Sequence, residues 1–348
     1  IANSNGQGYL VLINGDGDFR AMKTSGMDNA QIAWSPHGLF FSDVDNDYRL
    51  TDNLTVTESP KARFQQAIAA TDDGSAIALY NNGFTASGNT EQLVVTDQDS
   101  VTKTEVEGYY HVTGFCDGTL YGIAPPSGRY HAIARHQGLQ MQGTHGDTTA
   151  LMFNQLSHTE RNREQLLGLT AVSESTQSAL DAPCEDGVLH HLGSTRDGEQ
   201  HLPVLRSWDT ETGEYSEKPL NVQGTMPLPT SADTYYLRPD SGSIKDGHFE
   251  WVCTDGRVMS TDLQTGDTTE RFVLTPQIDT SAAALPWHRN VTFTEDRIVT
   301  LTWDAASETY HYTEFDRDTG KQRKHLELPS LAEELGNPDL VMRDLAVR

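Results

Sequence analysis

The amino-acid sequence predicts an all-β protein, a β-propeller built from four-stranded blades in a single domain of residues 1–348. Two observations predict this fold. Strand-length runs of roughly five to eight residues recur along the chain between Gly, Asn and Asp, and helical periodicity is almost absent. The clearest repeat spans residues 289–328, where four successive strands become more polar towards the last, as strands do between the centre and the rim of a blade.

Turns of the form D-x-x-T-G recur at Asp209–Gly213, Asp262–Gly266 and Asp316–Gly320. An Asp carboxylate can accept a hydrogen bond from a backbone N–H two residues on, and Gly tolerates the positive φ that closes a hairpin. The expected outer hairpins, about 43 residues apart, suggest seven or eight blades, with the count favouring eight; they fall near residues 16, 52, 98, 136, 174, 212, 265 and 319.

Ring closure is expected where the two ends of the chain share one blade. Residues 339–347 would supply its inner strand and residues 8–24 its outer strands, so that N- and C-terminal strands pair. A short helix is expected just before the closing strand, because Ser330 and Glu333 form a capping box.

Two motifs resemble known propeller families. The segment AWSPHGLFFSD is similar to the WSPDG repeat of TolB-like and WD40-like propellers, with His37 in place of Asp, and the D-x-x-T-G turns resemble YncE-like and quinoprotein repeats. The resemblance implies a propeller and no particular function, since such families include scaffolds, periplasmic binding partners and enzymes. Quinoprotein repeats also carry a Trp shortly after the T-G pair, which these turns lack, so no quinone cofactor is expected.

The charge of the chain excludes two classes of partner. It has 25 basic and 50 acidic residues and a net charge of −25, so nucleic acid and anionic membrane surfaces are not expected as partners. No stretch approaches the roughly 18 apolar residues that a membrane helix needs, so direct insertion into a membrane is not expected either. The chain starts at Ile1 without Met, followed by a polar run, which favours removal of a leader. We therefore expect residues 1–7 to be a flexible tether and the acidic protein to be secreted, periplasmic or surface-anchored as a lipoprotein.

Three widely spaced cysteines, Cys116, Cys184 and Cys253, exclude a zinc knuckle and a dense disulfide framework. They fit buried strand residues, or one bridge with a third cysteine left over.

A row of alternate carboxylates, Asp43, Asp45 and Asp47, raises the possibility of a calcium site. An EF-hand loop would need Gly where Tyr48 stands and an acidic residue where Leu54 stands. A plain hairpin turn explains the same residues, so no cofactor is predicted and calcium remains the alternative.

Nucleophile elbows, HExxH motifs and phosphate-binding loops are absent from the sequence, so the catalytic residues, if any, are unknown. The segment ALPWHRN is the best candidate for ligand binding, because Trp287, His288 and Arg289 would precede a strand at one end of the ring.

The sequence therefore favours a non-catalytic binding or scaffold propeller that recognises a protein, peptide or glycan through loops at one end of its channel. The alternatives are an extracellular hydrolase or lyase with its site at the channel mouth, and a structural module of a larger assembly.

Overall fold

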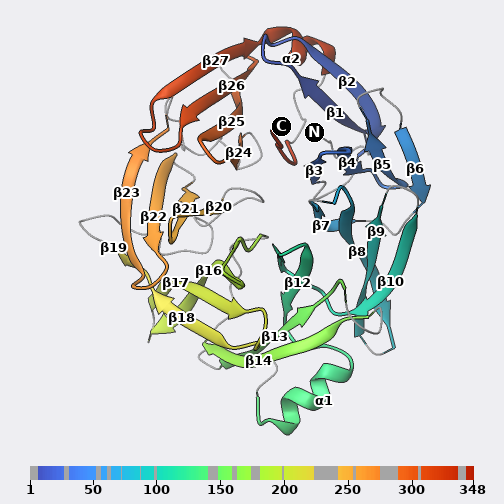
Figure 1. The fold of residues 1–348 in the computed structure, drawn as a ribbon, viewed down its shortest axis with the longest axis vertical. Coiled ribbons are helices and arrows are strands. Elements are labelled where there is room, and N and C mark those ends of the chain that lie inside the picture. The colour runs from blue at the N-terminus through green and yellow to red at the C-terminus, as the bar shows by residue number, and fades with distance from the viewer. Residues whose placement is uncertain are drawn as a thin grey trace.

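The computed structural model is a ring of β-sheets around a central axis (Figure 1). It describes residues 7–26, 31–51, 56–60, 64–71, 73–86, 88–97, 100–139, 148–158, 163–173, 181–197, 200–222, 242–253, 256–274, 289–304, 307–335 and 342–348. The predicted all-β propeller is confirmed. In Figure 1 the first strand of a sheet, such as β20, lies towards the centre of the ring and the fourth, such as β23, towards its rim.

Each sheet is formed by consecutive antiparallel strands. In the first half of the chain these are β3 (Ile32–Ser35), β4 (Gly38–Ser42), β5 (Asn46–Leu50) and β6 (Val56–Pro60); β7 (Gln65–Ala70), β8 (Ala76–Thr85), β9 (Gly88–Thr96) and β10 (Val101–Glu107); and β11 (Val112–Cys116), β12 (Thr119–Ala124), β13 (Thr148–Gln155) and β14 (Gln165–Ser173).

In the second half they are β15 (Cys184–Glu185), β16 (Val188–Asp197), β17 (Gln200–Asp209) and β18 (Tyr215–Pro219); β20 (Gly242–Lys245), β21 (His248–Val252), β22 (Arg257–Asp262) and β23 (Asp267–Val273); and β24 (Arg289–Phe293), β25 (Arg297–Asp304), β26 (Thr309–Asp316) and β27 (Gln322–Leu328). A short strand, β19 (Asn221–Val222), adds to β23 in parallel. The helices are α1 (Arg129–His136) and α2 (Pro329–Leu335), and α2 confirms the predicted short helix.

The predicted count of seven or eight four-stranded blades is wrong, because the described residues form six such sheets. One cause of the overcount is the sheet β11–β14. Helix α1 lies between β12 and β13, so this sheet occupies more of the chain than its neighbours. The hairpin expected near residue 136 falls at the end of α1 instead of in a turn, and the outer hairpin of this sheet joins Gln155 to Gln165.

The D-x-x-T-G turns fold as the sequence predicts. Asp262 accepts hydrogen bonds from the backbone N–H groups of Gln264 and Thr265, at 2.9 and 2.7 Å. Gly266 then adopts a φ of +79°, in the left-handed region that glycine tolerates best. The local chemistry of this turn fixes the hairpin of β22 and β23.

A two-stranded sheet, β1 (Gln7–Ile13) and β2 (Phe19–Ser25), lies between β27 and the sheet β3–β6 (Figure 1). The hairpin predicted within residues 8–24 is therefore present, and ring closure through paired N- and C-terminal strands stays a prediction. The inner strand predicted at residues 339–347 is not seen, because residues 342–347 form no strand and residues 339–341 lie outside the described part. The Asp344 carboxylate of the C-terminal segment accepts the Ile32 N–H of β3 at 2.7 Å.

Apolar side chains between neighbouring sheets form the core. Trp208 and Trp251 are among the largest fully buried side chains. The Trp251 indole N–H donates to the Thr261 hydroxyl at 3.2 Å, so the ring is buried without losing this hydrogen bond. These tryptophans belong to the packing between blades.

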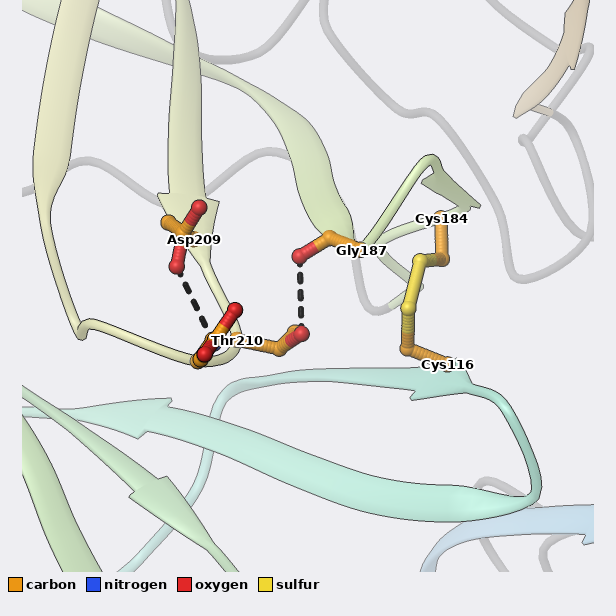
Figure 2. The surroundings of a disulfide bond; sticks show 6 residues. Cys116, Cys184, Gly187, Asp209 and Thr210 are labelled. Atoms are coloured by element: carbon orange, nitrogen blue, oxygen red, sulfur yellow. Dashed lines mark hydrogen bonds between the residues drawn. A yellow bond between two sulfur atoms is a disulfide. The ribbon is translucent and has the colours of Figure 1, made fainter.

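A disulfide joins two neighbouring sheets, since Cys116 at the end of β11 is bonded to Cys184 at the start of β15 (Figure 2). Close by, the Thr210 hydroxyl donates to the Gly187 carbonyl at 2.7 Å. Cys253 is buried in the core cluster of the sheet β20–β23. The structure therefore agrees with the interpretation that one disulfide forms and the third cysteine is left over.

Candidate functional site

A cavity of about 750 Å³ lies beside β1, between residues of the sheets β3–β6 and β24–β27. Its walls come from β1 and β2, from β25 and β26 on one side, from β3 and β4 on the other, and from the C-terminal residues. The lining residues are Leu10, Val11, Leu12, Ile13, Asn14, Gly15, Asp18, Phe19, Arg20, Ile32, Trp34, Leu39, Arg297, Tyr312, Glu314, Leu345, Ala346, Val347 and Arg348. An apolar cavity of this size with a few polar groups is typical of a ligand site.

Three arginines line this cavity in a chain of net charge −25. Arg297 is neutralised by Glu314, with 3.1 Å between Nη1 and Oε2. The guanidinium of Arg348 lies 5.8 Å from the centre of the Trp34 ring. Arg20 is exposed and forms no ion pair within the described part of the chain. The cavity therefore offers Arg20 as a positive group for an anionic ligand.

Glu314 is held in its ionised form at the cavity wall. Partial burial acts to raise the pKa of Glu314, but hydrogen bonds from Tyr312 and Arg297 outweigh it and lower the pKa below its usual value. Burial and the neighbouring Glu314 carboxylate both raise the pKa of Tyr312. At neutral pH the pair is a carboxylate and a neutral phenol, which suits binding better than proton transfer.

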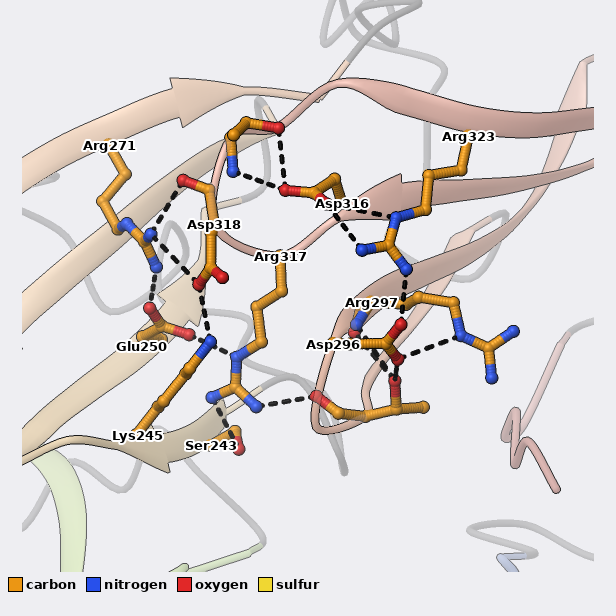
Figure 3. Close-up of polar contacts among 12 residues, drawn as sticks. Ser243, Lys245, Glu250, Arg271, Asp296, Arg297, Asp316, Arg317, Asp318 and Arg323 are labelled. Atoms are coloured by element: carbon orange, nitrogen blue, oxygen red, sulfur yellow. Dashed lines mark hydrogen bonds and ion pairs between the residues drawn. The ribbon is translucent and has the colours of Figure 1, made fainter.

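A polar network connects the sheets β20–β23 and β24–β27 (Figure 3). Arg317, in the turn after β26, donates through Nε to the Glu250 carboxylate of β21 at 2.7 Å. Its other nitrogens donate to the Thr294 carbonyl at 2.7 Å and the Ser243 hydroxyl at 3.1 Å, and Arg271 also contacts Glu250. Because these groups use their hydrogen-bonding capacity on each other, the network is a structural link between blades.

A buried carboxyl group lies on β9. Glu91 has no exposed surface, and its Oε2 accepts the Tyr110 N–H at 3.4 Å while Oε1 has no partner among the described residues. Burial raises the pKa of Glu91 well above its usual value. Such a group is the kind of acid that an active site uses, but Glu91 does not line the cavity beside β1.

One group of side chains in the described residues could hold a metal ion, namely His311, His325 and Glu327 on β26 and β27. The sequence analysis missed it. The alternation of His325 and Glu327 is visible in the sequence, but the third member comes from the neighbouring strand, and the strand register that brings it close cannot be read from spacing alone.

The family model of the YycP β-propeller domain matches residues 1–348. The chain belongs to this family. No curated protein sequence matches it significantly. Among the described residues of this YycP-family propeller, no helix is long and apolar enough to cross a membrane.

Solved structures of similar fold have sequences far from this YycP-family chain. A mutant of the apocarotenoid oxygenase of Synechocystis is 11% identical, with a TM-score of 0.51 over 92% of this chain and 84% of that chain. Apo AztD from Citrobacter koseri is 10% identical (TM-score 0.47; 94% and 82%), and BamB from Moraxella catarrhalis is 14% identical (TM-score 0.44; 86% and 73%). The similarity to the oxygenase shows a common fold alone.

The structure places the three predicted calcium ligands of this YycP-family propeller in a hairpin. Asp43 accepts the N–H groups of Asp45 and Asn46, both at 2.9 Å, and the Tyr48 hydroxyl at 2.8 Å. Asp47 accepts the Ser42 hydroxyl at 2.7 Å and also contacts Tyr80. The turn interpretation accounts for these contacts, and calcium binding stays the untested alternative.

The predicted ligand-binding residues are placed only in part. Trp287 and His288 lie outside the described residues. Arg289 begins β24 and pairs with Thr302 of β25, at the same end of the sheet as Asp304. A ligand site at Trp287, His288 and Arg289 therefore stays a prediction.

Proposed function

We propose that this YycP-family protein is a non-catalytic binding propeller that works outside the cytoplasm and holds an extended peptide segment beside β1. The observation that carries the proposal is the cavity between β1, the sheet β24–β27 and the C-terminal residues. Its volume and its mixture of apolar walls and a few polar groups fit the capture of a short segment of chain.

The backbone of β1 supports a peptide as the occupant. Within the described residues β1 pairs with β2 alone, whereas the inner strands of the other sheets continue a four-stranded ladder. The edge of a strand presents N–H and C=O groups that an added strand can satisfy, with side-chain pockets supplying selectivity. The apolar residues of β1 line the cavity from this side.

The positive charge of Arg20 at the cavity supports a ligand peptide that carries a carboxylate. Arg20 is exposed at the cavity and lies outside every ion pair of the described residues, while the chain as a whole is strongly acidic. A local positive group on an acidic protein selects the anionic end of a ligand, because the remaining surface repels it. A free C-terminus or an acidic side chain would supply that end.

The Cys116–Cys184 disulfide supports the proposed location outside the cytoplasm. Stable disulfides are typical of secreted, periplasmic and surface proteins and are rare in the cytosol. The bridge joins β11 to β15, and so contributes to the packing of one sheet against the next.

Fluorescence anisotropy with labelled octapeptides tests the proposal. Each peptide has apolar residues at alternate positions and is made with a free and with an amidated C-terminus. We expect binding of the free-carboxylate form, weakened at least tenfold in Arg20→Glu. Lys23→Glu is the matched control, because Lys23 lies on the same strand, is exposed and does not line the cavity.

Two results would contradict the proposal: no peptide of the panel binds, or Arg20→Glu and Lys23→Glu weaken binding equally. Mass spectrometry of the peptides after incubation addresses the alternative function. Intact peptides are expected from a binding propeller, whereas cleavage would favour the hydrolase or lyase.

A further inference from the structure

Three side chains with metal-binding groups meet on the last sheet of the ring. His311 comes from β26, and His325 and Glu327 come from β27. One ligand atom from each lies within 4.8 Å of the others. In the residues that the structure describes, no second group of three His, Cys, Asp or Glu side chains is so close.

The strand ladder brings these side chains together. His311 pairs with Glu327 across the two strands, and the next position on the same face pairs Thr313 with His325. Paired residues, and residues two apart on one strand, point to the same face of a sheet. The two imidazole rings stack with their centres 5.3 Å apart. Regular backbone pairing, rather than a loop, therefore sets the spacing.

We propose that His311, His325 and Glu327 bind a divalent transition-metal ion of the zinc type. Two imidazole nitrogens and one carboxylate oxygen form a donor set that zinc uses in proteins, with the fourth position left to water or another ligand. Zinc ligands about 2.1 Å from the ion lie roughly 3.4 Å apart in a tetrahedron. The present limit of 4.8 Å is wider than that spacing, so a bound ion would draw the three side chains closer together.

Neighbouring polar groups orient both imidazole rings. The Thr313 hydroxyl lies 3.0 Å from Nδ1 of His325. A hydrogen bond from Nδ1–H to that oxygen leaves the Nε2 lone pair of His325 for a metal. On the other ring, Nε2 of His311 lies 3.9 Å from the Asp304 carboxylate. Partners of this kind set the tautomer and the direction of metal-binding histidines.

The second nitrogen of His311 is an unexplained buried polar atom. Its Nδ1 is shielded from solvent and has no hydrogen-bond partner in the described part of the protein. A buried polar atom without a partner costs free energy. Coordination through Nδ1 would satisfy this atom and leave Nε2 facing Asp304, which is the usual arrangement of a carboxylate behind a metal-bound histidine.

The donor set also selects among metal ions. Imidazole favours zinc and its transition-metal neighbours, whereas calcium and magnesium require mainly oxygen ligands. This site is independent of the proposed peptide cavity. His311 and Tyr312 are consecutive residues of one strand, so they point to opposite faces of the sheet, and only Tyr312 lines the cavity.

Isothermal titration of chelator-treated full-length protein with ZnCl2 tests the proposal. We expect one zinc site that is lost in His325→Gln, weakened at least tenfold in Glu327→Gln and weakened about tenfold in Thr313→Val. His248→Gln is the matched control, because His248 is an exposed strand histidine outside the group, and its zinc binding should equal that of the unsubstituted protein. CaCl2 and MgCl2 should not compete.

The proposal is overturned if the protein binds no zinc, or if the zinc site keeps its affinity in both His325→Gln and Glu327→Gln. Competition by calcium at concentrations comparable to zinc would also overturn it, because imidazole ligands could not then dominate the site. Near-ultraviolet circular dichroism of each metal-free variant checks that the fold is retained. Loss of zinc with normal peptide binding would leave the proposed function untouched.

Discussion

Arg317 and Glu250 form a buried ion pair between two neighbouring sheets, with 2.7 Å between Nε and Oε2 and with each side chain 4% exposed. The pair belongs to residues 67 positions apart in the sequence. A buried charge that loses its partner is costly, because its desolvation is no longer offset. The contact between the sheets β20–β23 and β24–β27 therefore depends on this pair.

Arg317→Met should reduce the free energy of unfolding by about 3 kcal/mol, because it removes the more buried of the two cationic partners of Glu250 and leaves only Arg271. Urea unfolding measures the loss. Arg323→Met is the control: Arg323 pairs with Asp296 and Asp316 but is 38% exposed, so solvent screens its ion pairs and its loss should cost clearly less. Equal effects of the two substitutions would show that the buried pair has no special role.

Glu91→Gln should stabilise the protein above pH 5 and leave it nearly unchanged at lower pH. Burial raises the pKa of Glu91 in the folded state above its usual value near 4.5, so the folded chain binds a proton that the unfolded chain releases. Stability then falls as pH rises from 4.5 towards the raised pKa, and the amide removes this dependence. Urea unfolding of both proteins between pH 4 and 8 measures the difference, and a constant difference would contradict burial as the cause.

Removing the disulfide with the double variant Cys116→Ala, Cys184→Ala should lower the free energy of unfolding by about 3 kcal/mol, since the bridge spans 68 residues. Cys253→Ala, which removes a buried thiol outside the bridge, should cost about 1 kcal/mol. Thiol titration of the unfolded, unreduced protein should find one reactive group. Three reactive groups would show that the bridge does not form.

Gly213→Ala should destabilise the protein more than Gly247→Ala does. Both glycines have positive φ, at 72° and 74°, so the backbone strain of the two substitutions is similar. A Cβ at Gly213 would lie 2.1 Å from the Leu167 carbonyl, whereas a Cβ at Gly247 would meet nothing within 4 Å. The difference in thermal midpoint isolates the close approach of the β17–β18 turn to β14, and equal midpoints would mean that the turn can move away.

The fold could be predicted from the sequence because its signals are local. The D-x-x-T-G turns, the short polar-edged strands and the helix near residue 330 each depend on residues a few positions apart, and the structure contains all three, although α2 begins at Pro329, one residue before the expected cap Ser330. The number of sheets could not be predicted, because α1 lengthens one sheet by an insertion that the sequence pattern does not distinguish from a further hairpin. The distance between turn motifs along the sequence measures only chain length, so an inserted helix can be mistaken for part of another blade.

The candidate sites could be predicted far less well, because they depend on contacts between distant segments. The cavity combines residues near both ends of the chain, and Asp344 reaches Ile32 across 312 positions. The metal-binding group needs the register of β26 against β27 to bring His311 beside Glu327. A single sequence carries no direct record of such pairings.

Hydrogen exchange of β1 tests the central claim most directly. Its backbone amides should become protected when a peptide with a free carboxylate binds, because a strand added at the edge of β1 would hydrogen-bond to them. We expect slower exchange in residues 8–13 with that peptide, and no change with the amidated peptide or in Arg20→Glu. Binding without any added protection of β1 would contradict the account, since the peptide would then lie elsewhere on the propeller.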